Sequence, residues 1–163
     1  MNADDSAQQR LELQIFSSAF GTQRILVDVS PAATWLLRRW ARLRPAVLVP
    51  LIPSMDSVIR LESTERLFRE LSAPPAEPLL PYYVLNHFDP AQPLHMEVQN
   101  ALRRRLGERL LRFTVHDSPA VAEAVAEGMT VLDYAPDAPV AQEYRDIAAW
   151  LRSVSAPRSA EAP

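Results

Sequence analysis

Short apolar runs alternate with amphipathic stretches along the chain. The runs at 24–29, 46–51, 82–86 and 111–115 are short, mostly apolar and rich in Val and Leu, which predicts strands, and the run at 24–29 is expected to be buried on both faces. Apolar side chains recur at helical spacing over 10–20, 31–43, 54–71, 94–106, 120–127 and 140–151, which predicts helices there. Because strands alternate with helices, the expected fold is a three-layer α/β fold, with a mostly parallel sheet and flanking helices.

Glycine and proline mark the ends of these elements. Gly107 and Gly128 each follow a predicted helix, where a left-handed residue commonly ends one. The segment 72–81 contains four prolines and is expected to be a surface connector rather than a domain boundary. We expect a disordered N-terminus over 1–9, one α/β domain over 10–152 and a disordered tail over 153–163.

Composition narrows the class of protein. The 163 residues are 48% apolar, which is enough for one domain with a real core. A formal net charge of -3 gives no reason to expect a nucleic-acid partner. There is no cysteine, no apolar run long enough to span a bilayer, and the polar, acidic start is not a signal peptide. A cytoplasmic location is therefore expected.

Asp28 follows the first predicted strand directly and precedes Ser30 and Pro31, which suit the start of a helix. Ligands of open α/β folds bind at the carboxyl ends of parallel strands, and the order strand, acid, loop, helix is typical of a Walker B segment. Two interpretations stay open: Asp28 acts near a metal ion or an attacking water, or it caps the helix. A phospho-receiver site is disfavoured, because it needs a lysine late in the chain.

All 17 basic residues are arginines, and this bears on phosphate binding. The loop G-x-x-x-x-G-K-[ST] needs its lysine to reach the β and γ phosphates and its glycines for close backbone approach. The chain has no lysine, and its three glycines are far apart. A complete Walker A loop is therefore absent from these 163 residues.

Other polar residues permit weaker interpretations. Asn86 ends the third predicted strand with an amide that could read a base edge, although loop capping is the favoured explanation of this residue taken alone. The three histidines lie in different segments without ligand spacing, so no metal site is expected. His116-Asp117 is expected to form a turn, because no nucleophile is placed with it. The arginines at 103–105 are expected on a solvated helix face or against an acidic partner.

Several segments occur in an order and spacing known from one family. They are Ile25–Asp28 with Ser30-Pro31, Leu48–Leu51 through Ser57, Tyr83–Asn86 with Phe88-Asp89, Arg109–Leu111 with Val115-His116 and Ala122–Ala124, and Tyr134–Pro139 with Ala141 and Tyr144. Through them the chain resembles the C-terminal part of the BcsQ (YhjQ) type of protein encoded in bacterial cellulose operons. That type belongs to the ParA/MinD family of deviant-Walker P-loop ATPases. The resemblance covers about residues 10–152.

The resemblance implies ATP and magnesium as cofactors. It places Asp28 in the Walker B role near magnesium and the attacking water, and Asn86, Ala135 and Pro136 on the adenine side. The family's first strand, its phosphate loop and its switch I have no counterpart here. Because the clamp on metal and phosphates supplies nearly all the catalysis of phosphoryl transfer, we expect that this chain alone does not hydrolyse ATP.

The resemblance also implies an accessory role in bacterial cellulose biosynthesis. Its expected partners are components of the cellulose synthase complex and a second copy of the chain in a homodimer. The expected site is the inner face of the inner membrane, reached only through partners. The alternatives are a nucleotide-free protein-interaction module and a truncated partitioning or localisation ATPase. Since the family's phosphate-loop strand separates those matching 24–29 and 46–51, these two should pair directly or leave apolar edges open.

Overall fold

A computed structural model describes residues 25–30, 33, 36–41, 44–71 and 79–154. It divides the chain into two compact units, Met1–Arg44 and Pro45–Pro163. The expectations for 1–9, for a helix over 10–20, for most of the connector at 72–81 and for 155–163 lie outside the described residues.

The described part of the first unit contains one short helix, α2 (Leu36–Trp40), inside the predicted helix at 31–43. Residues 25–30 form neither helix nor strand, and Ile25 and Leu26 are 44% and 86% exposed. The prediction of a buried strand over 24–29 is therefore wrong for the described residues. An apolar run becomes a strand only where a neighbour satisfies its backbone N–H and C=O groups, and no described strand pairs with this one.

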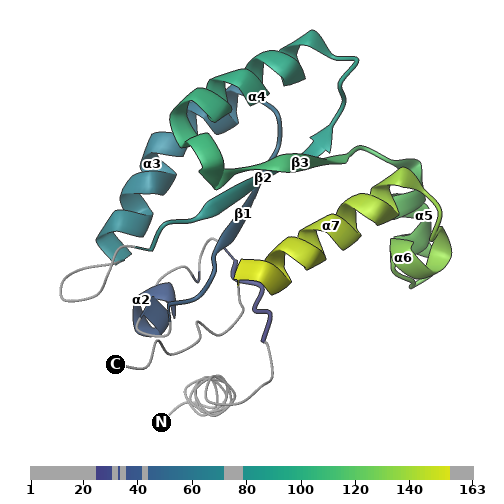
Figure 1. The fold of residues 1–163 in the computed structure, drawn as a ribbon, viewed down its shortest axis with the longest axis horizontal. Helices are drawn as coiled ribbons and strands as arrows, with labels where there is room; N and C mark the ends of the chain where they lie inside the picture. Colours follow the sequence, from purple (N-terminus) through teal and green to yellow (C-terminus); the bar gives the residue numbers. More distant parts are fainter. Residues whose placement is uncertain (1–24, 31–32, 34–35, 42–43, 72–78, 155–163) are drawn as a thin grey trace. The chain divides into compact units, whose positions relative to one another are not determined.

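The second unit is built on a parallel sheet in the order β1 (Leu48–Leu51), β2 (Tyr82–Phe88) and β3 (Leu110–His116), as Figure 1 shows. These strands confirm three of the predicted apolar runs. β2 continues past Asn86, so the prediction that Asn86 ends it is wrong. The extension follows an irregular register between Leu85 and Phe88, which a pattern of apolar residues does not reveal.

The helices of this unit are α3 (Met55–Leu71), α4 (Pro93–Leu106), the 3-10 turn η3 (Gly107–Arg109), α5 (Pro119–Ala126), α6 (Val131–Tyr134) and α7 (Pro139–Val154). Gly107 and Gly128 follow α4 and α5 with positive φ angles of 57° and 67°, which confirms that a glycine stands at the end of each helix. α6 was not predicted, because one turn is too short to show a helical period. α7 runs to Val154, so the prediction of a disordered tail is wrong for Ser153 and Val154.

Two layers of helices enclose the sheet (Figure 1). On one face, Tyr83 and Leu85 of β2 join a core with α3 and α4. On the other face, Val84 of β2 joins a core with α5, α6 and α7, where Tyr82 and Trp150 stack edge to face at 4.9 Å. Alternate residues of one strand thus serve opposite layers, which confirms the three-layer α/β fold.

β1 forms one edge of the described sheet. The Tyr82 N–H donates to the Val47 carbonyl at 2.8 Å, and Val49 and Leu51 stand opposite Tyr83 and Leu85. Because backbone groups of successive residues point to opposite sides of a strand, residues 47, 49 and 51 face β2. Pro50 then faces the open side, where its missing N–H removes no bond of the sheet.

Candidate functional site

Six ionisable side chains gather where β2 and β3 end, the edge at which open α/β folds bind ligands. β2 and the loop after it contribute His87 and Asp89, while β3 and its loop contribute His116 and Asp117. His95 comes from the first turn of α4 and Glu143 from α7. We call this set the carboxyl-edge cluster: His87, Asp89, His95, His116, Asp117 and Glu143.

The tightest link of the cluster joins β3 to α7. The carboxylate of Glu143 accepts the His116 backbone N–H at 2.8 Å and also contacts His116 Nδ1 directly. The Glu143 side chain is only 16% exposed, whereas that of His116 is 40% exposed. One largely buried carboxylate therefore fixes both the backbone and the ring at the end of β3.

His87 occupies a left-handed conformation, with φ of 55°, although it is not a glycine. Its Nδ1 lies 3.1 Å from Asp117 Oδ1, and the Asp117 N–H donates to the Phe88 carbonyl at 3.3 Å. A left-handed non-glycine residue costs roughly 1–3 kcal/mol and is typical of functional segments. The irregular end of β2 turns the exposed His87 toward the loop that follows β3.

Asp89 organises the loop that leads into α4. Its N–H donates to His95 Nδ1 at 3.0 Å, and its carboxylate accepts from the Ala91 N–H at 2.9 Å and from Gln92 Nε2 at 3.1 Å. The bond from Ala91, followed by that from Gln92, lowers the pKa of Asp89. Asp89 is therefore a stable carboxylate at this edge.

The residues predicted for nucleotide binding are distributed over both units. Asp28 is exposed in the first unit and follows no strand there. Asn86 is half-buried within β2, and among the described residues no hydrogen bond to its side chain is found. Ala135 is half-buried against the core beneath α7, while Pro136 is exposed. No described hydrogen bond links Asn86 to the Ala135-Pro136 loop.

The cluster was not predicted as a unit. His116 and Asp117 were expected to form a turn. Instead, His116 pairs with Glu143, and Asp117 pairs with His87. The positions of Asp89 and Asp117 just after two strands were the available signal. The pairing of His116 with Glu143 spans 27 residues and follows from tertiary packing alone.

The chemistry of the cluster favours histidine–carboxylate pairing over metal or phosphate binding. In the described ranges, no group of three or more acidic, histidine or cysteine side chains could hold a metal ion. Its three carboxylates, Asp89, Asp117 and Glu143, would repel a triphosphate. The described residues therefore do not fit a complete site for magnesium and ATP.

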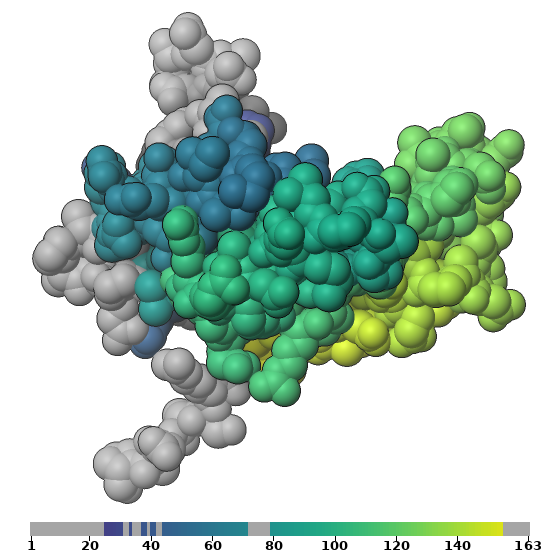
Figure 2. All heavy atoms as spheres, turned by 90° about the horizontal axis from the view of Figure 1, so that it is seen from above, coloured from purple at the N-terminus to yellow at the C-terminus, as the bar shows by residue number. Residues whose placement is uncertain are grey.

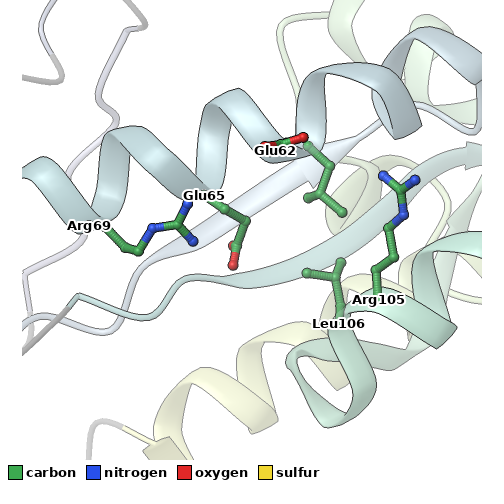
Figure 3. A pocket seen from close by; sticks show the side chains of 6 residues that line it. Glu62, Glu65, Arg69, Arg105 and Leu106 are labelled. Atoms are coloured by element: carbon green, nitrogen blue, oxygen red, sulfur yellow. The ribbon is translucent and has the colours of Figure 1, made fainter.

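An open hollow of about 260 Å³ lies between α3 and α4, with Glu65 and Arg69 of α3 and Arg105 of α4 in its lining (Figure 3). Glu65 also belongs to a second polar set. Glu65 binds Arg109 through two contacts of 2.8 and 2.6 Å, and the Tyr83 hydroxyl donates directly to Glu65. The bond from Arg109 lowers the pKa of Glu65, whereas burial and then the Glu65 carboxylate raise the pKa of Tyr83 far above its usual value. These satisfied charges join α3, β2 and η3 and so stabilise the fold.

Two of the three consecutive arginines donate to backbone carbonyls of other elements. Arg103 donates to the carbonyls of Leu110 and Leu111, the latter at 2.8 Å, and Arg105 donates to the Val58 carbonyl at 3.2 Å. The expectation of a solvated or partner-binding face is therefore wrong for Arg103, which is half-buried, and Arg105 is tied to α3. Arg104 and Arg105 are both exposed, as expected.

The fold and this edge define the class of protein. A three-stranded parallel sheet between two helical layers, with polar groups at the carboxyl ends of the strands, is consistent with part of a P-loop NTPase fold. The family model "Cellulose biosynthesis protein BcsQ" matches residues 22–151, about four-fifths of the chain. The chain therefore belongs to this family and is an accessory protein of cellulose biosynthesis. Within the described ranges, no helix combines the length and apolarity of a membrane span.

Proposed function

We propose that this chain serves cellulose biosynthesis by binding other components and does not hydrolyse ATP on its own. The observation that supports this most is the charge at the carboxyl edge, where three carboxylates stand at the ends of β2 and β3 and would repel the phosphates of a nucleotide bound there. The sequence adds no lysine to offset them. Without a cationic clamp on the phosphates, the electrostatic part of phosphoryl-transfer catalysis is missing.

Asp28 has a conditional role in this proposal. Its place after an apolar run matches a Walker B acid, but its exposed position lacks the strand that would aim it. We propose that it acts on magnesium or water only when further protein supplies the phosphate loop. Asn86, Ala135 and Pro136 are then the adenine side of the same incomplete site.

Partners and location follow from the family. Components of the cellulose synthase complex are the proposed partners, and a homodimer is the proposed assembly. The chain would reach the inner face of the inner membrane through these partners. A nucleotide-free interaction module is the second candidate, favoured by the half-buried Ala135 and by the repulsive edge.

Two measurements on the purified chain test the proposal. Turnover of radiolabelled ATP with magnesium should not exceed that of a buffer blank. Turnover that Asp28→Ala abolishes would refute the proposal, because it would require a working catalytic site. Thermal melting with ATP separates the two candidates, since a ligand at about 100 times its dissociation constant adds about 2.7 kcal/mol of stability. A shift that Asn86→Ala removes indicates nucleotide binding, and no shift indicates the nucleotide-free module.

A further inference from the structure

The segment 119–138, which contains α5, α6 and the turns after them, differs from the rest of the second unit in charge. We call it the α5–α6 knob (Figure 2). Between residues 113 and 144 there are six acidic side chains and no arginine or lysine. All 17 basic side chains thus lie elsewhere, and the knob contributes four carboxylates: Glu123, Glu127, Asp133 and Asp137.

The knob also exposes large apolar side chains. Val125 is 72% exposed, Met129 44%, Tyr134 40% and Leu132 38%. The side chains that it packs toward α7 and the sheet are mostly small ones, with Ala124 and Val131 buried. Most surface helices turn large apolar residues inward, so the arrangement in the knob is the reverse of the usual one.

Local hydrogen bonds and a positive φ angle order the turns of the knob. Thr130 Oγ1 donates to Asp133 Oδ2 at 2.6 Å and so fixes the start of α6. The Tyr134 hydroxyl lies 3.4 Å from Glu123 Oε2, which ties α6 to α5. Gly128 ends α5 with φ of 67°. A preformed surface loses little conformational entropy on binding, which favours affinity.

We propose that the α5–α6 knob docks a basic amphipathic segment of a partner polypeptide. Apolar side chains of that segment would cover Val125 and Leu132, while its arginines or lysines would face Glu127 and Asp137. An apolar centre with a charged rim is the usual arrangement of such an interface. The same negative charge disfavours anionic lipid and nucleic acid. The inference goes beyond the proposed function, because it holds whether or not nucleotide binds.

Fluorescence anisotropy with the whole chain tests this docking. The probe is a labelled synthetic peptide of about 18 residues, long enough for a helix, with Leu on one face and Lys on the other. A control peptide has Glu in place of Lys. Val125→Ser probes the apolar centre, and Ile59→Ser on α3 is its control, because these side chains are 72% and 71% exposed. Glu127→Gln with Asp137→Asn probes the rim, and Glu62→Gln with Glu97→Gln is the control pair.

The proposal expects the basic peptide to bind and the acidic one not to bind. Val125→Ser should weaken binding by about tenfold relative to Ile59→Ser. The double variant Glu127→Gln with Asp137→Asn should weaken binding of the basic peptide by about threefold at low salt. That difference should vanish near 1 M salt, where the Debye length is about 3 Å. Absence of binding, or equal losses in the knob and control variants, would overturn the proposal. A dimer in sedimentation velocity that Val125→Ser dissociates would also overturn it, because a second copy would then cover the knob.

Discussion

Replacing Glu65 by glutamine should destabilise the second unit by about 2–3 kcal/mol. In the folded protein the Glu65 carboxylate receives two hydrogen bonds from Arg109, at 2.8 and 2.6 Å, and one from the Tyr83 hydroxyl. Glutamine keeps the shape but removes the charge and turns an N–H group toward the guanidinium. Hydrogen bonds to charged groups contribute about 1.5–3 kcal/mol each, and the Glu65 and Arg109 side chains are only 18% and 26% exposed, so solvent screens them little.

Thermal melting followed by far-ultraviolet circular dichroism measures this change. At about 2–4 °C per kcal/mol, the melting temperature should fall by about 4–12 °C. Glu62→Gln on the same helix is the matched control, because that carboxylate is 77% exposed and 3.8 Å from Arg66. Its effect should stay within about 0.5 kcal/mol. Hydrogen exchange at the amides of β2 and β3 would assign the loss to the second unit.

The effect should also depend on pH. Because the pKa of Glu65 is lower in the folded chain than in the unfolded chain, its ion pair stabilises fully above the unfolded pKa of about 4.3. That stabilisation is lost as the pH falls through the lower folded pKa. The difference between wild type and Glu65→Gln should therefore shrink under acidic conditions. Equal melting of Glu65→Gln and Glu62→Gln at neutral pH, or a difference that persists undiminished in acid, would refute the reasoning.

Three further changes test other contacts. Glu143→Gln removes the charge that holds His116 and should speed hydrogen exchange in the first turns of α7 more than elsewhere, at a cost of about 1–2 kcal/mol; uniform exchange would contradict a local link. Gly128→Ala meets nothing within 4 Å, so it should lower stability by only about 1 kcal/mol through its φ of 67° in urea titrations, and a stabilised variant would contradict this. Arg103→Met should lower the melting temperature clearly, because Arg103 donates to the Leu111 carbonyl at 2.8 Å. Arg104→Met should hardly change the melting temperature. Equal losses in the two variants would contradict a structural role for the Arg103 hydrogen bond.

Local patterns predicted the elements that depend on local interactions. Helical spacing and a following glycine located α4 and its end at Gly107, since both effects act within a few residues. The prediction of a strand at 24–29 failed, because a strand forms only beside a partner strand, and the apolar run does not specify that partner. The predicted end of β2 at Asn86 was wrong for a similar reason, since the left-handed His87 contacts Asp117, which lies 30 residues away in the sequence.

The candidate site was harder to predict than the fold. Acids after β2 and β3 could be expected at the carboxyl edge, because parallel strands end together there. Their partners could not, since Glu143 reaches His116 only through the packing of α7 on β3. The charge pattern of the knob was visible in the sequence, but the outward direction of Val125 came from the fold.

Pro50 bears on how the sheet of the second unit can grow. On the open side of β1 the backbone offers the N–H and C=O of Leu48 but only the C=O of Pro50. An arbitrary extended chain would therefore find too few donors along this four-residue edge to form a regular ladder. A chain that binds at this edge must therefore gain its affinity from side-chain contacts. Non-specific pairing of extended chains with β1 is disfavoured, while a partner with complementary side chains can still bind there.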